Sequence, residues 1–199
     1  MKRLFDILIS LILIFLFSPI IILVWLYIRI VSPGEVFYNS KRVGINNQIF
    51  LMPKFRSMKM GTPQLATHLL KKSEQYLIPG GSLIRKLSLD ELPQLWSVIK
   101  GDMSLVGPRP ALFNQDDLIK QRTDCGVEKI KPGITGWAQI NGRNNLSWNE
   151  KFKMDIYYIE NISLVLDLKI LTLTFIKILK SEGVNQSKEI PMIPFNGNN

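Results

Sequence analysis

The N-terminal stretch from Ile7 to Ile28, ILISLILIFLFSPIIILVWLYI, carries no charged residue and is rich in isoleucine, leucine and phenylalanine. Its length suits a helix that crosses a membrane, which needs about 20 apolar residues. A secretory signal peptide is disfavoured because no small-residue cleavage site follows. The stretch therefore predicts a membrane segment at the N-terminus.

Two features of this segment bear on its topology. Pro19 follows Ser18 near its centre and has no N–H, so we expect a kink, with the Ser18 hydroxyl satisfying a freed carbonyl. Lys2, Arg3 and Arg29 flank the run, which favours both ends on the cytoplasmic side. Each arm is about 12–14 residues, or roughly 18–21 Å, and is too short to cross a core about 30 Å thick. The residues alone leave open a re-entrant helix-break-helix and an ordinary kinked span.

Composition limits the functions that the rest of the chain can have. The chain has 199 residues and a net charge of +9, enough for one globular domain plus a membrane segment. This charge suits an anionic membrane surface or a nucleotide-linked substrate, and no nucleic-acid partner is expected because no nucleic-acid module is present. Cys125 and His68 are the only cysteine and histidine, which excludes an internal disulfide and a metal site made of several histidines. Carboxylates and cations must carry any catalysis.

The pattern along the chain predicts an α+β fold, mainly helical, with short strands and amphipathic helices at the membrane interface. Turn residues from Ser32 to Gly34 divide a membrane segment, 1–31, from a cytosolic domain, 32–183, and 184–199 read as a tail. We expect strands at Val36–Tyr38 and Ile49–Leu51 around an Asn46-Asn47 turn, a loop and a short helix in 61–81, and a rigid loop at 106–110. Helices are expected after Asp90 and at Asn114–Arg122, Trp148–Tyr158 and Leu164–Leu179, the last either in the core or at the interface.

Residues Ser88-Leu89-Asp90-Glu91-Leu92 place adjacent carboxylates at the start of a predicted helix. A structural interpretation takes Asp90 or Ser88 as the helix N-cap, the latter with Glu91 in a capping box. A functional interpretation takes Asp90 as a nucleophile, since a carboxylate is ionised at neutral pH and can attack phosphorus. Its neighbour could then hold a divalent cation against a diphosphate. The residues leave both interpretations open.

Cationic side chains near turns are candidate phosphate ligands, because guanidinium forks match phosphate oxygens. Arg85 lies five residues before Asp90, and Arg109 is held between two prolines. Asp167 interrupts an apolar helix, where an acid is costly unless it is paired. We expect it either to pair with a nearby Lys or Arg or to have a functional role.

Ordered motifs along nearly the whole chain resemble those of the bacterial monotopic phosphoglycosyl transferases, also called bacterial sugar transferases. The chain is especially similar to the small form of that family, typified by the Campylobacter enzyme that starts N-linked glycan assembly. The matching stretches are Lys2–Asp6, Phe17–Pro19, Lys54–Met58, Arg85–Leu92, Lys100–Pro110, Lys131–Arg143 and Asp167–Lys169.

The resemblance implies a membrane enzyme with a re-entrant anchor and a catalytic domain facing the cytoplasm at the bacterial inner membrane. Such an enzyme transfers a sugar 1-phosphate from a UDP-sugar to undecaprenyl phosphate and releases UMP, with Mg²⁺ as cofactor. Downstream glycosyltransferases are conceivable partners. The competing hypothesis is a membrane-anchored basic scaffold protein without catalysis.

The resemblance also implies roles for single residues. Asp90 is the nucleophile, which forms a covalent phospho-sugar intermediate, and Glu91 is the acid associated with magnesium. Lys54 and Asp167 match positions needed for catalysis. Substrate-binding roles fall on Arg85, Arg109 and Arg143, and the break in the membrane hairpin on Ser18 and Pro19.

Overall fold

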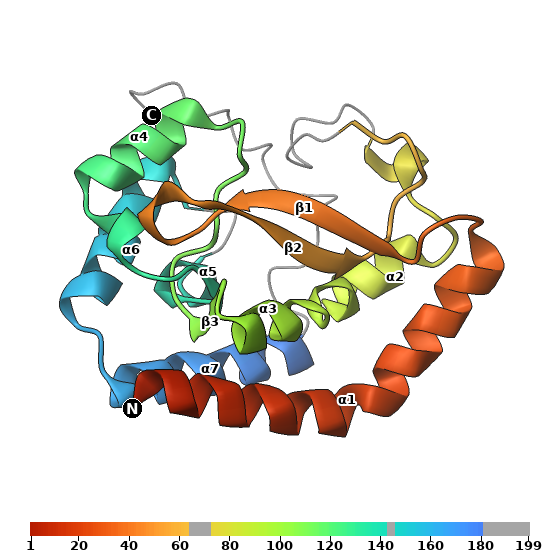
Figure 1. Cartoon of the computed structure of the whole chain (residues 1–199), viewed down its shortest axis with the longest axis horizontal. Coiled ribbons are helices and arrows are strands. Elements are labelled where there is room, and N and C mark those ends of the chain that lie inside the picture. The colour runs from red at the N-terminus through yellow and green to blue at the C-terminus, as the bar shows by residue number, and fades with distance from the viewer. Residues whose placement is uncertain (64–72, 143–145, 181–199) are drawn as a thin grey trace.

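The structure, a computed structural model, describes residues 1–63, 73–142 and 146–180. Within these ranges the chain is α+β and mainly helical, as predicted, with a long apolar N-terminal helix and two sheets of two strands each (Figure 1). The predicted tail, 184–199, lies outside the described residues.

The N-terminal helix α1 runs from Lys2 to Val31 without interruption and contains Pro19. It bends partway along its length, with one arm below the domain and the other rising beside it (Figure 1). Pro19 cannot donate to the carbonyl of Phe15, four residues earlier. The Ser18 hydroxyl donates to this Phe15 carbonyl at 2.8 Å. The predicted compensation by Ser18 is therefore confirmed.

A β-hairpin forms the centre of the domain. Strands β1, Phe37–Val43, and β2, Ile49–Phe55, pair antiparallel with Phe37 opposite Phe55 and Val43 opposite Ile49. Both strands are longer than predicted, and Val36 lies outside β1. The connecting turn η1, Ile45–Asn47, holds Asn46 and Asn47 at positive φ, which asparagine tolerates better than most residues.

A second, parallel pair of strands was not predicted. Strands β3, Ser104–Val106, and β4, Gly133–Thr135, have three residues each and pair through Ser104 with Gly133. The backbone segments at Gly107 and Gly133 lie so close together that a Cβ on Gly133 would overlap the Gly107 backbone. This contact fixes the start of the Gly107–Ala111 loop against β4.

Short helices surround the predicted dyad. Helix α2, Gly81–Lys86, leads through the 3₁₀ turn η4, Leu89–Glu91, to α3, Gln94–Lys100. Neither predicted cap forms: Pro93 occupies the N-cap position of α3, and Ser88 makes no side-chain capping bond. Gly101 ends α3 in the left-handed conformation. Another 3₁₀ turn, Ser73–Tyr76, precedes α2, and residues 64–72 of the predicted loop lie outside the described ranges.

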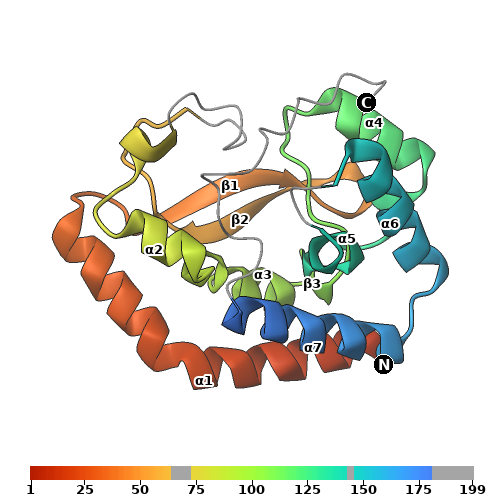
Figure 2. The same cartoon turned by 180° about the vertical axis from the view of Figure 1, so that it is seen from behind.

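The C-terminal half contributes the remaining helices, of which α4, α6 and α7 were predicted. Helix α6 begins at a capping box formed by Ser147 and Glu150. The elements of this half are α4 (Asp116–Asp124), η5 (Val127–Lys129), α5 (Trp137–Ile140), α6 (Trp148–Glu160) and α7 (Leu164–Leu179). Helix α7 lies beside the first arm of α1 in both views (Figures 1 and 2).

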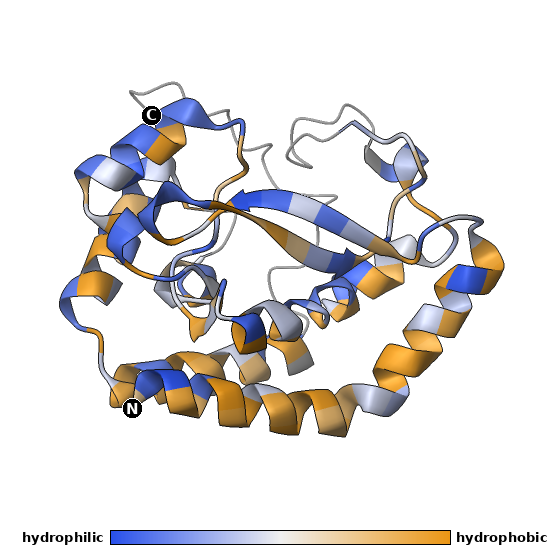
Figure 3. Ribbon diagram, in the orientation of Figure 1, coloured by the Kyte–Doolittle hydropathy of each residue, from blue (hydrophilic) through white to orange (hydrophobic). Residues whose placement is uncertain are grey.

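The main core lies between α1, α3, α7 and the strands. Val98, Met103 and Ile170 are fully buried there, and Phe5 and Ile9 of α1 pack against them. A second cluster joins Val24 and Ile28 of the other arm of α1 to Phe55 and Ile84. Both arms of α1 therefore use one face to cover the domain, and the opposite face is apolar and exposed (Figure 3).

Candidate active site

The adjacent carboxylates Asp90 and Glu91 lie in a tight turn between α2 and α3. Ser88, two residues before Asp90, has a φ of 55°, an uncommon conformation for a residue with a side chain. Such conformations cost free energy and cluster at functional sites. The turn brings the dyad against β2, which supplies Lys54.

Glu91 lies between cations from two distant parts of the chain. Its Oε1 accepts hydrogen bonds from Lys54 Nζ and Arg109 Nη2, each at 2.7 Å. Burial would raise the pKa of Glu91, but Arg109 and Lys54 hold it well below its usual range. Glu91 is therefore ionised at neutral pH, and Arg109, whose own pKa is raised by the charge of Glu91, is held toward it.

Asp90 has a different environment from its neighbour. Its side chain is buried, and this burial raises its pKa, opposed by Lys54 and reinforced by the charge of Glu91. A buried carboxylate with a raised pKa is more basic than an ordinary aspartate and carries less hydrating water, which suits a nucleophile. The two acids thus differ: Asp90 is buried with a raised pKa, whereas Glu91 is fixed by ion pairs and has a lowered pKa.

The positive charges around the dyad outnumber its carboxylates. Arg85 lowers the pKa of Asp90, as do Lys54 and Arg109. Arg42 of β1, which was not predicted to belong to the site, lies near enough to Glu91 and Arg109 that their charges affect its pKa. Burial lowers that pKa to about 10, and the charge of Arg109 adds to this effect. The excess positive charge suits an anionic ligand.

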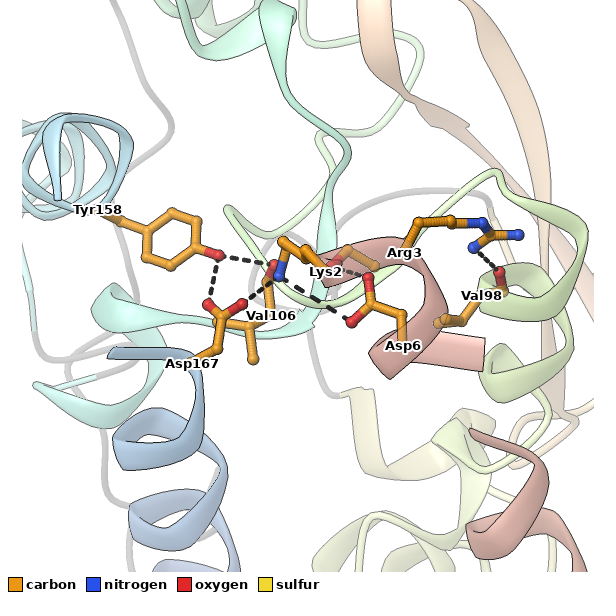
Figure 4. A network of polar contacts seen from close by, with 8 residues as sticks. Lys2, Arg3, Asp6, Val98, Val106, Tyr158 and Asp167 are labelled. Carbon is orange, nitrogen blue, oxygen red and sulfur yellow. Dashed lines mark hydrogen bonds and ion pairs between the residues drawn. The ribbon is translucent and has the colours of Figure 1, made fainter. Parts of the chain in front are cut away.

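Asp167, predicted to be catalytic, makes its hydrogen bonds and ion pair with residues other than those around Asp90 and Glu91 (Figure 4). Its Oδ2 accepts from Lys2 Nζ at 2.5 Å, and its Oδ1 accepts from the Tyr158 hydroxyl at 2.7 Å. Nearby, Ser104 donates to Asp6 at 2.8 Å. The expected pairing with a Lys is confirmed, and this network joins α1, α6, α7 and β3.

The remaining predicted residues are placed as follows. Lys54, Asp90, Glu91 and Arg109 come together, and Arg85 acts on Asp90 through its charge. Ser18 and Pro19 lie in α1. Arg143 lies outside the described residues.

Comparison with known proteins identifies the family. The family model for bacterial sugar transferases matches residues 1–181. The chain belongs to the bacterial sugar transferase family. An uncharacterized sugar transferase, EpsL, of Bacillus subtilis strain 168 is 44% identical, and the alignment covers 99% of this chain and 96% of EpsL.

Other family members carry names that state a reaction. The UDP-glucose:undecaprenyl-phosphate glucose-1-phosphate transferase of Escherichia coli K12 is 35% identical over 89% of this chain and 40% of its own length. The undecaprenyl-phosphate galactose phosphotransferase of Salmonella typhimurium LT2 is 36% identical over 92% of this chain and 41% of its own length. This bacterial sugar transferase thus spans less than half of these two longer relatives.

The carboxylates of this bacterial sugar transferase fit a magnesium ion that substrate helps to bind. No group of three or more acidic, histidine or cysteine side chains gathers within the described ranges, so the protein alone offers no complete cage there. Mg²⁺ is commonly held by one or two carboxylates together with substrate phosphates. Glu91 would supply one such carboxylate through Oε2, since Lys54 and Arg109 both donate to its Oε1.

Proposed function

We propose that this protein transfers a sugar 1-phosphate from a UDP-sugar to undecaprenyl phosphate and releases UMP, the first membrane step of bacterial glycoconjugate assembly. The observation that carries the proposal is the split dyad: a buried Asp90 of raised pKa beside a Glu91 fixed by Lys54 and Arg109. The names of the relatives support the same reaction.

In the first step Asp90 attacks the sugar-bearing β-phosphorus. A carboxylate oxygen–phosphorus bond forms as the bond from that phosphorus to the bridging oxygen of UMP breaks, and UMP leaves. The product is a covalent phospho-sugar on Asp90. Lys54, Arg85 and Arg109 surround the dyad and would stabilise the charge on the phosphate oxygens.

In the second step a phosphate oxygen of undecaprenyl phosphate attacks the same phosphorus. The bond to Asp90 breaks, the carboxylate is regenerated, and the sugar leaves on undecaprenyl diphosphate. Two displacements at one phosphorus predict ping-pong kinetics.

Arg109 connects the dyad to a pocket. It contacts Glu91 through Nη2 and also lines a pocket together with Val43, Pro110 and Ile130. We place the diphosphate at Arg109. Glu91, with Asp90, would hold Mg²⁺, which when bound neutralises charge on the diphosphate.

The anchor geometry supports a monotopic attachment at the inner membrane, with the domain in the cytoplasm. At one end of α1, Lys2 pairs with Asp167 of α7. After the other end, Arg56, which directly follows β2, donates to the carbonyls of Ser32 and Pro33. Since both ends contact one domain, both belong on one side of the membrane. We accordingly assign 1–31 to a re-entrant anchor and 32–183 to the catalytic domain.

The test is UMP release by the detergent-purified full chain. The protein is incubated with Mg²⁺, undecaprenyl phosphate and a panel of UDP-sugars, in parallel with Asp90→Asn. UMP from one sugar, dependent on undecaprenyl phosphate and absent in Asp90→Asn, is the expected result. Unchanged UMP release by the variant would contradict Asp90 as nucleophile. No UMP from any sugar, with folded and membrane-bound protein, would favour the scaffold hypothesis.

A further inference from the structure

The loop that carries Arg109 has few backbone N–H groups with which to pair. Pro108 and Pro110 flank Arg109 and have no N–H, so this part of the loop offers mainly carbonyl oxygens. The Arg109 side chain is partly exposed, yet its Nη2 lies 2.7 Å from Glu91 Oε1. The orientation of Arg109 therefore depends on what binds the loop carbonyls.

Each of four successive carbonyls in this loop accepts a hydrogen bond from a different donor. The outer two accept from backbone amides: Pro108 from Gly133 at 2.9 Å, and Ala111 from Val43 at 3.0 Å. The inner two, on Arg109 and Pro110, accept from arginine side chains.

The first of these arginines is Arg122 of α4. Its Nη1 donates to the Arg109 carbonyl at 2.5 Å, and its Nη2 pairs with Asp155 of α6 at 2.9 Å. Asp155 is buried, so its ion pair limits the movement of the Arg122 guanidinium. The fork of Arg122 thus connects the Arg109 backbone to two helices.

The second is Arg42 of β1, on a different element. Its Nη1 donates to the Pro110 carbonyl at 3.1 Å, and its Nε donates to the buried Ser40 hydroxyl at 3.0 Å. The like charge of Arg109 lowers the pKa of Arg42, so Arg42 keeps this hydrogen bond despite repulsion from Arg109.

We propose that Arg42 and Arg122 are positioning residues that clamp the carbonyls of Pro110 and Arg109, and so hold the Arg109 guanidinium against Glu91. Neither needs to touch substrate. The effect on turnover rests on the proposed function, whereas the effect on the order of the loop does not.

The test uses Arg42→Lys and Arg122→Lys, which keep the charge but lose the fork. The matched control is Thr123→Val, next to Arg122 on α4. It removes the hydrogen bond that Thr123 accepts from Asn47 without touching the loop. Amide hydrogen exchange of a peptide spanning 107–113 measures loop order, and steady-state kinetics measures turnover.

We expect the 107–113 peptide to exchange about tenfold faster in each Lys variant and unchanged in the control, because a hydrogen bond from a charged donor is lost. We also expect kcat/KM to fall about tenfold in each Lys variant, and less than twofold when Arg122→Lys is added to Arg109→Ala, because the clamp acts through Arg109.

Unchanged exchange of the loop in both Lys variants would overturn the clamp. If Arg122→Lys lowers kcat/KM as much in the Arg109→Ala variant as in the wild type, the claim that the clamp acts through Arg109 is overturned. If the wild-type protein releases no UMP while the Lys variants loosen the loop, the clamp stands and the proposed reaction fails.

Discussion

At the residue scale, Asp90 and Glu91 are neighbours with opposite electrostatic roles. Burial disfavours the charge on Asp90, whereas Lys54 and Arg109 favour the charge on Glu91. A neutral side chain at position 90 therefore removes a desolvated charge. We expect Asp90→Asn to abolish UMP release without lowering the thermal unfolding temperature, as measured by calorimetry in detergent. A marked fall in that temperature would contradict this account of Asp90.

The same change at Glu91 should have the opposite effect on stability. Glu91→Gln removes the negative charge with which Lys54 and Arg109 both pair. Removing one partner of a buried charged pair is destabilising, here by about 2 kcal/mol after allowing for the partial exposure of Arg109. Denaturant unfolding of the two variants side by side measures the contrast. Equal stabilities would show that the ion pairs of Glu91 contribute nothing.

The pH dependence of stability gives a further prediction for Glu91. Its folded pKa lies below its unfolded value of about 4.3, so its ion pairs stabilise the fold above that pH and are lost as pH falls through the lower, folded pKa. In an Asp90→Asn background, Glu91→Gln should lower the free energy of unfolding by a constant amount near neutral pH. This loss should become smaller below pH about 4. A loss in the free energy of unfolding that stays constant at every acidic pH at which the protein is folded would contradict the lowered pKa of Glu91.

The sequence located part of this site. The adjacent acids and Arg109, held between prolines, were recognisable because their chemistry is local. Arg42 and Arg122 were missed because they bind backbone carbonyls far along the chain, and such contacts leave no motif. An arginine that binds a carbonyl next to a proline looks in sequence like any surface cation.

At the element scale, the first arm of α1 is attached by charges as well as by packing. Arg3 donates to the carbonyls of Val98 and Ile99 at the end of α3, and Lys2 pairs with Asp167 (Figure 4). Asp167 thus has a structural role in the described network, in addition to any part in catalysis.

A double-mutant cycle separates these roles of Asp167. Lys2→Met and Asp167→Asn should each lower stability by about 1–2 kcal/mol, since Lys2 is partly exposed, and the double variant should lose less than their sum. Turnover should fall in parallel in the two single variants if Asp167 acts through the anchor. Loss of turnover in Asp167→Asn alone, with Lys2→Met active, would instead assign Asp167 to catalysis.

Elements with a strong local signal were predicted well. The β-hairpin, the capped helix α6 and the apolar helix α7 have clear periodicity or end signals. Strands β3 and β4 were missed because each has three residues and is stabilised only by pairing across the chain.

At the scale of the whole molecule, the exposed apolar residues gather on the helices that border one side. They include Leu11, Phe15 and Leu23 of α1 and Val165 and Phe175 of α7 (Figure 3). Attachment should therefore depend on apolar burial more than on the net charge of +9. We expect the protein to stay in the membrane fraction at about 1 M salt, where charges are screened beyond about 3 Å, and to leave it in detergent. Release by salt alone would indicate electrostatic binding, as in a basic scaffold.

The contacts at both ends of α1 predict that both ends lie on the same side of the membrane, which is the cytoplasmic side in the proposed topology. In a Cys125→Ser background, a cysteine added after Met1 and Glu35→Cys test the two ends separately. Neither should react with a membrane-impermeant maleimide in sealed spheroplasts, and both should react after permeabilisation.

Pro19→Ala tests whether the bend in α1 depends on Pro19, because alanine restores the missing backbone N–H. A straight helix of 30 residues would be about 45 Å long, enough to cross a core about 30 Å thick. Crossing would require one end to leave the domain, so Pro19→Ala should weaken the contacts at one end and lower the unfolding temperature. Labelling of one end of the unaltered α1 in sealed spheroplasts would contradict the re-entrant topology, because the contacts of Lys2 and of Ser32 could not then be made by the same domain.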